Sequence, residues 1–254
     1  MKKAIALLLL SLFAFNAQAQ DEEKAWSISL DQAIYDKYVW RGIQYNEEGV
    51  NQGSIDFSYD TGDMGVFGLN VWYNLDLDNE NGLSGEFSEV DYTIYWEKSF
   101  GDFTLGAGHI YYDFSEVDAG STREVYVSIA YETFLSPSVT VYYDYEDVDG
   151  FYVDFAVGHS FDLGVAGMTL DLGANIAWAD DDMSDGYYGG DGAGFSNWGA
   201  SIALNIPVGD MFTITPSIAY YSLLSDANDN ATDSNGRGLE DDDFIFGVNV
   251  NFSF

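Results

Sequence analysis

Cysteine is absent from the 254-residue sequence, and proline occurs only three times. Without disulfides, the fold must be held by backbone hydrogen bonds and by burial. Scarce proline leaves long stretches free to form β-strands, because proline cannot donate to a sheet ladder. Basic residues are also few, with 8 Lys and Arg against 43 Asp and Glu. This balance excludes nucleic acid as a partner, since its binding requires cations that neutralise phosphates. It leaves open whether the acidity serves a salty habitat or a function.

The sequence also lacks a run of apolar residues long enough for a transmembrane helix, which needs roughly 20 residues. The longest run, residues 4–15, follows Lys2 and Lys3 and precedes Ala17 and Ala19. A short apolar run with basic residues before it and small residues after it is typical of a secretory signal. We therefore predict a cleaved signal peptide over residues 1–19 and one domain over residues 20–254.

Aromatic residues are abundant, at 17% of the chain, and they organise its last eleven residues, FIFGVNVNFSF. Large apolar residues alternate there with Gly, Asn and Ser, which is the period of a β-strand with two different faces. Eleven residues match a strand that crosses a bilayer at a tilt, for which roughly 9 to 11 are needed. The ending resembles the C-terminal strand that outer-membrane barrels present to their assembly machinery. We expect Phe252 and Phe254 to act as the assembly signal.

The same alternation recurs in about twelve segments from Trp26 onward, and the connections between them alternate in length. Short turns alternate with connections that are mostly long, acidic and rich in Gly or Asn. An even strand number with short turns at one end and long loops at the other is typical of bacterial membrane barrels. The sequence thus predicts an all-β fold, a transmembrane antiparallel up-and-down β-barrel of about 12 strands with both termini periplasmic. The alternative is a secreted β-sandwich, which has no reason to sort its loops by end.

Two segments depart from a simple pattern. In residues 103–114 the apolar parity changes, which predicts a bulge near Gly108 and His109. Pro216 interrupts a segment in which every residue of a closed barrel should donate, so we expect a bulge or strand end nearby.

The parity opposite to the apolar face predicts the residues that line the lumen, and it is polar, as an aqueous channel requires. Lys37 and Arg41 have this parity in the first segment. We expect them to pair with Asp56, Asp76 or Asp91; the alternative is a transverse field across a constriction. The predicted pore-lining residues are Lys37, Arg41, Asp56, Trp72, Asp76, Glu89, Asp91, Tyr95, Tyr126, Asp144, Asp154 and Asp171. Further residues of this parity include Glu97, Tyr111, Glu124, Tyr142, Glu146 and Tyr152.

The expected lining has two functional consequences. Its excess of carboxylates predicts a preference for cations and argues against the uptake of acidic sugars. Its inward aromatic residues either fill a modest interior or offer a stacking surface for sugar or nucleoside rings.

The first segment carries a resemblance to a known family. Its sequence YDKYVWRGIQ, residues 35–44, resembles the "S-x-Y-x-F-R-G-x-x-Q" start of the TorF-type porin family, with Tyr38, Arg41, Gly42 and Gln44 at matching positions. Trp40 replaces the usual Phe. The resemblance implies an outer-membrane barrel of porin type.

The residues predict neither an enzyme nor a tightly bound cofactor. The two histidines, His109 and His159, lie in strand segments, and His159 cannot share a proton with Ser160 because strand neighbours point to opposite faces. Clustered loop carboxylates could hold Ca²⁺ or Mg²⁺ weakly through oxygen ligands; these are Asp180, Asp181, Asp182 and Asp185, and residues 240–243. Residues 226–237 imitate a calcium loop but lack its glycine and its bidentate glutamate.

Two functions remain open at this stage. The first is an outer-membrane porin-like channel for passive diffusion of small solutes, with a cation preference. The second is a structural or adhesive barrel whose lumen is plugged by side chains, since about twelve strands lie between filled and open barrels. In either case the expected partners are outer-membrane lipid and lipopolysaccharide, the barrel-assembly machinery, and small hydrophilic solutes or cations.

Overall fold

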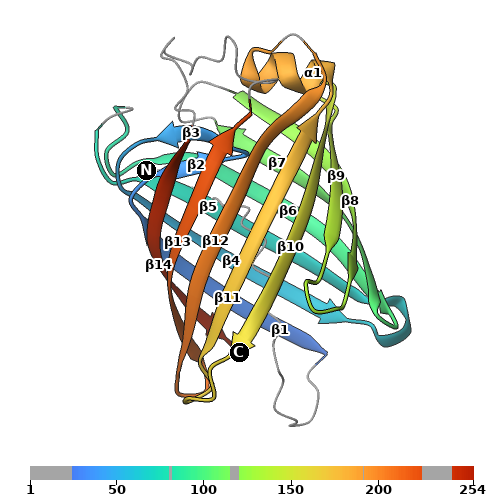
Figure 1. Cartoon of the computed structure of the whole chain (residues 1–254), viewed down its shortest axis with the longest axis vertical. Helices are drawn as coiled ribbons and strands as arrows, with labels where there is room; N and C mark the ends of the chain where they lie inside the picture. The colour runs from blue at the N-terminus through green and yellow to red at the C-terminus, as the bar shows by residue number, and fades with distance from the viewer. Residues whose placement is uncertain (1–24, 80–81, 115–119, 191, 225–241) are drawn as a thin grey trace.

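The chain forms one closed antiparallel β-barrel of twelve strands, as predicted (Figure 1). The computed structural model describes residues 25–79, 82–114, 120–190, 192–224 and 242–254. The predicted signal peptide lies outside the described residues. The wall consists of β1 (Trp26–Tyr35), β4 (Val50–Asp60), β5 (Val66–Asp76), β6 (Phe87–Phe100), β7 (Phe103–Phe114), β8 (Gly120–Tyr131), β9 (Ser138–Asp144), β10 (Gly150–Asp162), β11 (Thr169–Ala179), β12 (Gly194–Val208), β13 (Phe212–Leu223) and β14 (Asp242–Ser253).

The barrel closes because β1 pairs with both β4 and β14. Leu30, for example, lies between Ile55 of β4 and Phe252 of β14. No strand of the wall is left with an unpaired edge, which removes the risk that open sheets carry of pairing with other chains.

The period of two gives the wall an apolar outer face and a polar inner face. On β4, Ile55 and Phe57 are 48% and 44% exposed, whereas Asp56 between them points to the interior. The same alternation places Tyr92 outside and Asp91 inside on β6. A continuous exposed apolar surface around a barrel is the surface that lipid, rather than water, would solvate.

The connections differ between the two ends of the barrel (Figure 1). Short turns join β4 to β5, β6 to β7, β8 to β9, β10 to β11 and β12 to β13. The longest connections lie at the opposite end, where the connection from β9 to β10 is nevertheless as short as the turns. Ser29 of β1 pairs with Ser253 of β14, so both ends of the barrel sequence lie at the end with the short turns.

The predicted bulge in β7 is wrong. The strand pairs with β6 and β8 in an unbroken register from Phe103 to its end. Tyr112 is therefore inside and buried, and Tyr111, which we expected inside, stacks on Tyr92 of the outer face. Pro216 causes neither a bulge nor a strand end. Thr215 and Pro216 of β13 are skipped in the pairing with β12, and the register is the same on both sides of this gap.

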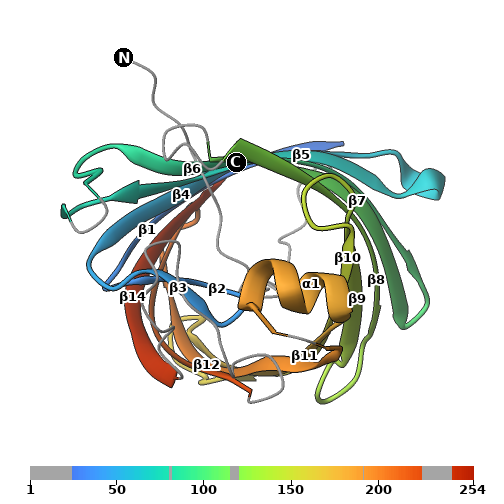
Figure 2. The same ribbon diagram turned by 90° about the horizontal axis from the view of Figure 1, so that it is seen from above.

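The largest departure from the predicted fold is that the first segment does not continue along the wall. It ends at Tyr35, and the chain then forms a separate hairpin from β2 (Tyr38–Trp40) and β3 (Ile43–Asn46). Viewed along the barrel, this hairpin lies inside the ring of strands, opposite the helical segment after β11 (Figure 2). We refer to it as the internal hairpin.

The connection between β11 and β12 folds into a short helical segment, α1 (Asp181–Met183) followed by a π-helical turn, η3 (Ser184–Tyr188). The Asp180 side chain caps it by accepting a hydrogen bond from the Met183 backbone N–H. Met183 and Tyr188 are buried. No helix in the described part of the chain is long and apolar enough to cross a membrane.

Candidate functional site

The internal hairpin turns at Arg41 and Gly42, which both have left-handed backbone angles, with φ of 51° and 81°. A two-residue turn with positive φ at both positions matches the twist of the strands that it joins. A Cβ on Gly42 would lie 2.7 Å from Asn197 Cβ of β12 and 2.8 Å from Leu223 Cδ2 of β13. The tip of the hairpin is therefore pressed against the wall, and only glycine fits there.

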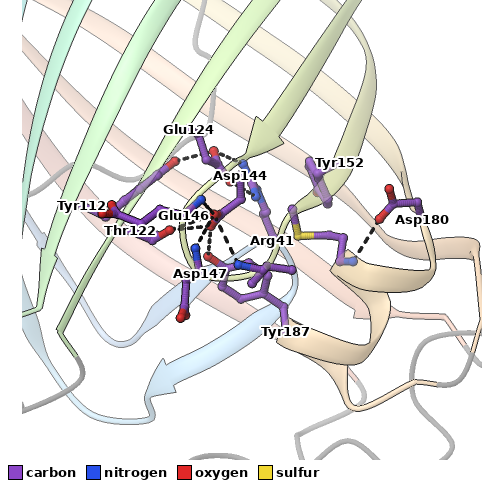
Figure 3. A network of polar contacts seen from close by, with 12 residues as sticks. Arg41, Tyr112, Thr122, Glu124, Asp144, Glu146, Asp147, Tyr152, Asp180 and Tyr187 are labelled. Carbon is purple, nitrogen blue, oxygen red and sulfur yellow. Dashed lines mark hydrogen bonds and ion pairs between the residues drawn. The ribbon is translucent and has the colours of Figure 1, made fainter.

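Arg41, at this tip, forms an ion pair with Glu124 of β8 (Figure 3). Its Nη1 and Nη2 each donate to one carboxylate oxygen of Glu124, both at 2.7 Å. The Tyr112 hydroxyl donates a third hydrogen bond to the same carboxylate at 2.9 Å. The side chains of Arg41 and Glu124 are only 4% and 0% exposed. A buried pair with this bidentate geometry fixes the position of the tip.

Three aromatic rings surround the Arg41 guanidinium. Its Cζ lies 4.3 Å from the ring centre of Trp40, 4.7 Å from that of Tyr142 and 4.2 Å from that of Tyr152. Ring faces attract a cation, especially where water is excluded. Burial acts to lower the pKa of Arg41, but Glu124 and its other partners hold that pKa above the usual value, so the guanidinium stays charged.

The helical segment secures the tip from the other side. The Tyr188 hydroxyl lies 3.0 Å from the Arg41 carbonyl oxygen and 3.3 Å from Asn197 Oδ1. Tyr152 also donates to Asn197 Oδ1, at 3.0 Å. Burial raises the pKa of Tyr188 to about 12, which keeps its hydroxyl protonated as a donor. Next to it, the Tyr187 ring packs edge-on against Trp40, with ring centres 5.1 Å apart.

The two sides of the internal hairpin contact different parts of the wall. The Tyr38 hydroxyl donates to Glu89 of β6 at 2.7 Å. Val39 packs against β13 and β14, in a cluster with Ala219, Tyr221 and Ile245. Gln44 accepts a hydrogen bond from Tyr221 at 2.9 Å. The four positions that resemble the TorF-type motif, Tyr38, Arg41, Gly42 and Gln44, thus all hold the hairpin inside the barrel.

A cavity of about 650 Å³ occupies the interior below the tip. Apolar surface predominates in its lining, and the charged groups of the lining are mostly acidic. The carboxylates that line it are Asp56, Asp91, Glu97, Asp154 and Asp171, and Arg41 is the guanidinium that reaches it. Since both carboxylate oxygens of Glu124 already bind Arg41, the net charge of the lining is negative.

Most of these carboxylates are oriented by neutral donors rather than by cations. The Tyr95 hydroxyl donates to Asp56 at 2.9 Å, Asn175 Nδ2 donates to Asp154 at 2.7 Å, and Asn205 Nδ2 donates to Asp171 at 2.6 Å. Such donors orient a carboxylate without cancelling its charge, so the charge remains free to act on an ion in the cavity.

The lining is also divided chemically. The rings of Tyr95, Tyr126, Tyr142 and Tyr152 line it from β6, β8, β9 and β10. Gly173 and Ser201 line it from β11 and β12.

The predicted pore-lining residues separate into two groups. Arg41, Asp56, Asp91, Tyr95, Tyr126, Asp154 and Asp171 line the cavity. Trp72, Asp76, Glu89 and Asp144 are instead buried around the internal hairpin and the long connections. Asp144, for instance, accepts hydrogen bonds from the hydroxyls of Thr122 and Tyr187.

The predicted ion-pair partners of Lys37 and Arg41 are wrong. Lys37 binds Asp243 at the start of β14, and Arg41 binds Glu124, so neither pairs with Asp56, Asp76 or Asp91. The reason is that the chain leaves the wall after Tyr35, which moves both residues away from the positions that a continued strand would give them. Glu146, expected inside, forms an exposed ion pair with Arg123.

The loop carboxylates proposed for weak metal binding do not form a cluster. In the ranges that the structure describes, no three His, Asp or Glu side chains converge as a metal site would require. Asp180 caps α1, and Asp181 accepts from the Ala193 backbone N–H at 2.7 Å. Residues 240 and 241 and the imitation calcium loop lie outside the described residues.

Four residues of the site were not identified from the sequence: Tyr112, Tyr187, Tyr188 and Asn197. The predicted change of parity within residues 103–114 places Tyr112 on the outer face, whereas the unbroken register of β7 places it inside. Tyr187 and Tyr188 lie in a connection that is otherwise acidic and rich in glycine. The one available signal was their aromatic character, because two adjacent tyrosines are unusual in a fully solvated loop.

Comparisons with known proteins support the fold alone. No protein-family model matches the chain, and no curated protein is similar to it in sequence. Among solved structures, the NanC porin matches with a TM-score of 0.52 and 13% identity, over 89% of this chain and 98% of that one. An outer membrane channel from Pseudomonas putida F1 matches with a TM-score of 0.50 and 10% identity, over 94% and 99% of the two chains. The chain therefore has the fold of outer-membrane channel barrels.

Proposed function

We propose that this protein is a porin-like channel of the outer membrane that lets small hydrophilic solutes diffuse passively and prefers cations. The observation that carries the proposal is the cavity inside a closed barrel, lined by carboxylates that form no ion pair with any residue that the structure describes. The fold shared with outer-membrane channels supports the same class of function.

The outer face supports a location in a membrane. Large apolar side chains are exposed on strands all around the wall, including Phe67, Ile94, Val127, Phe155 and Phe246. A soluble protein rarely exposes so large a continuous apolar surface. With the short turns placed on the periplasmic side, as in bacterial barrels, both described ends of the chain would be periplasmic, and the internal hairpin would lie near the external mouth.

Cation preference follows from the lining by a simple electrostatic argument. Screening in physiological salt has a length of about 8 Å, comparable to the half-width of so narrow a lumen, so the wall charges act on an ion that passes them. Rings of acidic side chains favour cations. The guanidinium of Arg41 offsets this little, since Glu124 binds it with both oxygens.

The test is the reversal potential of single channels in a KCl gradient. Wild-type protein should favour K⁺ over Cl⁻, and the double variant Asp56→Asn with Asp154→Asn should lose much of this preference. Asn keeps the shape and the acceptor oxygen at each position. The control variant, Asp63→Asn with Asp102→Asn, removes the same charge from exposed turns and should keep the preference. An anion-selective wild-type pore would refute the proposal.

A structural barrel with a closed lumen is the second candidate, and the internal hairpin favours it. Arg41, Tyr188 and Met183 are all buried at the long-connection end of the interior. If these residues seal the lumen, purified protein in planar bilayers will show no discrete conductance. The same recordings therefore separate the two candidates.

We also propose that the two histidines have no catalytic role and that the end of the chain acts in assembly. His109 Nε2 lies 2.7 Å from the Tyr145 hydroxyl, and His159 packs against the rings of Phe134 and Phe161. We propose that both contacts are structural, because each joins a histidine to an aromatic side chain. Phe252 packs on Phe212 of β13, and Phe254 follows the last strand. Their use as an assembly signal stays a prediction.

A further inference from the structure

Two tyrosine rings lie against the inner wall of the barrel, each over a glycine of the neighbouring strand. A Cβ on Gly68 of β5 would lie 2.0 Å from Tyr95 Cζ, and a Cβ on Gly108 of β7 would lie 2.4 Å from Tyr126 Cε1. The rings thus occupy the space that side chains at these two positions would fill. Both tyrosines are half-buried and line the cavity. One side of each ring is therefore covered by the wall, and the other side is available to a solute.

The strand register places these rings in one row around the wall, which we call the tyrosine row. Tyr95 pairs with Gly108, Gly108 with Tyr126, and Tyr126 with Tyr142. At Tyr142 the Arg41 guanidinium already covers the ring, with Cζ 4.7 Å from the ring centre. The part of the row that a solute can cover is therefore formed by Tyr95 and Tyr126.

Polar side chains lie beside Tyr126, on the side of the short turns. A Cβ on Gly106, the inward residue before Gly108 on β7, would lie 2.4 Å from Ser128 Oγ and 3.8 Å from Glu97 Cγ. Ser128 and Glu97 therefore meet over Gly106, one inward position below the Tyr126 ring, or about 7 Å along the strand. Register continues this polar row around the wall, and all its members line the cavity: Glu97, Ser128, Thr140 and Asp154.

We propose that the cavity binds neutral sugars, with a pyranose ring stacked on Tyr126 and its hydroxyl groups hydrogen-bonded to the adjoining polar row. A pyranose has C–H groups on its face, which suit the negative face of an aromatic ring. Its hydroxyl groups lie around the rim, where carboxylates and hydroxyls can accept from them. The inference rests on the proposed function, which it deepens by naming a solute class for the same lumen.

The cavity reaches the end of the barrel that carries the short turns. Its lining includes Ser136, in the turn between β8 and β9, and Ser160, near the end of β10. A sugar that enters at this end reaches Tyr126 without displacing the internal hairpin.

The polar row favours a neutral sugar over two other ring-shaped solutes. The carboxylates of the lining repel the carboxylate of an acidic sugar. A nucleoside base could stack on Tyr126, but its edge carries acceptor nitrogens and carbonyls, which would face the acceptor oxygens of Glu97. Every hydroxyl of a sugar can donate. The match also holds if a carboxyl group of the row is protonated, because it then still bonds to a hydroxyl.

The experiment is saturation-transfer NMR on the purified full-length barrel with methyl β-glucopyranoside and with sorbitol. The detergent is lauryldimethylamine oxide, which has no sugar headgroup. Both probes are neutral and rich in hydroxyls, but sorbitol is acyclic and has no rigid ring face. The glucoside should bind about three- to tenfold more tightly than sorbitol, as expected for one stacking contact. Equal affinities, or tighter binding of uridine than of the glucoside, would overturn the inference.

Variants at Tyr126 locate the site. Tyr126→Ala should weaken glucoside binding by about three- to tenfold, whereas Tyr126→Phe, which keeps the ring, should retain most of it. Tyr92→Ala removes a ring from the outer face of β6 and should leave binding unchanged. Heat-modifiable migration on gels checks that each variant is folded. Undiminished binding by folded Tyr126→Ala would overturn the assignment.

A second pair of variants tests the position of the ring rather than its presence. Gly108→Ala keeps Tyr126 but pushes its ring off the wall, so it should also weaken glucoside binding. Gly158→Ala is the control, because its added Cβ meets only the Leu172 backbone oxygen among the described residues, at 3.3 Å. Equal binding by the two folded glycine variants would overturn the role of the wall. If Tyr126→Ala does not fold, Gly108→Ala locates the site, and if neither folds, the comparison of the probes on wild-type protein decides.

Failure of this inference can be told apart from failure of the proposed function. A barrel that conducts K⁺ selectively but does not distinguish the glucoside from sorbitol remains a channel without the site. A barrel that binds the glucoside through Tyr126 but shows no conductance has the site and is not a channel.

Discussion

Arg123 and Glu124 are neighbours on β8, yet each takes part in an ion pair on a different face of the wall. Glu124 points into the barrel and binds Arg41, with side chains that are 0% and 4% exposed. Arg123 points outward and binds Glu146, with both side chains 38% exposed. The two pairs start from adjacent residues and differ mainly in their access to water.

This difference in access to water explains why the inner ion pair can hold the internal hairpin in place, whereas the outer ion pair contributes little to the position of the connection that it binds. An exposed ion pair gains little, because water solvates both charges almost as well when they are apart. In a buried pair neither charge can be solvated, so each depends on the other. The period of the strand, which sends adjacent residues to opposite faces, therefore decides the energetic role of each residue.

The largest effect should come from Glu124→Gln, which leaves the Arg41 charge buried without its partner. We expect the free energy of unfolding to fall by about 3–5 kcal/mol, measured by reversible urea unfolding in detergent or lipid. Adding Arg41→Met should recover much of the loss, because no charge then remains unpaired. A loss below about 1 kcal/mol for Glu124→Gln would match an exposed pair and would refute the distinction between the two pairs.

A second effect concerns how the tip of the hairpin reaches Glu124. Gly42→Ala places a methyl group against Asn197 and Leu223, at 2.7 and 2.8 Å. Gly82→Ala is the matched control, since Gly82 also has a positive φ, of 77°, and no atom of the described residues lies within 4 Å of its added Cβ.

Both glycine variants suffer the left-handed backbone penalty, but only Gly42→Ala also overpacks the interior. It should therefore lose about 1–3 kcal/mol more than Gly82→Ala in the same unfolding experiment. Equal losses would mean that the wall yields to the methyl group and that the tip is not tightly held.

The wall of the barrel could be predicted from the sequence because its signal is local and repeated. Each strand shows its own period of two, and the chain repeats it about twelve times. The false bulge in β7 arose where that signal is weakest. Gly106 and Gly108 face inward without side chains, so the parity of the strand could not be followed through them. After these glycines, Ile110 and Tyr112 place large apolar side chains on the inner face, where they pack in the buried cluster that includes the internal hairpin.

The internal hairpin could not be predicted for a different reason. Tyr38 and Trp40 continue the alternation of β1, and a period of two does not show whether a strand stays in the wall. What decides this is the fit of the hairpin to distant residues, such as Glu89, Glu124 and Tyr221. The Arg41–Gly42 turn was the one local signal, since glycine in a two-residue turn favours a hairpin. The helical segment that carries Tyr188 is too short to show a helical period.

The smallest effect should come from Arg123→Ala, which removes the outer ion pair and leaves the inner pair intact. Arg123 Cζ also lies 4.9 Å from the ring centre of Tyr111 on the outer face, so the variant loses one ring contact together with the ion pair. Because both partners are substantially exposed, we expect a loss of at most about 1 kcal/mol, and less at high salt, since ions screen exposed charges. The loss from Glu124→Gln should hardly change with salt, because mobile ions do not reach the buried pair. Urea unfolding of both variants at low and high KCl measures the contrast. If Arg123→Ala costs as much as Glu124→Gln, or if both losses respond equally to salt, burial is not what separates the two faces of β8.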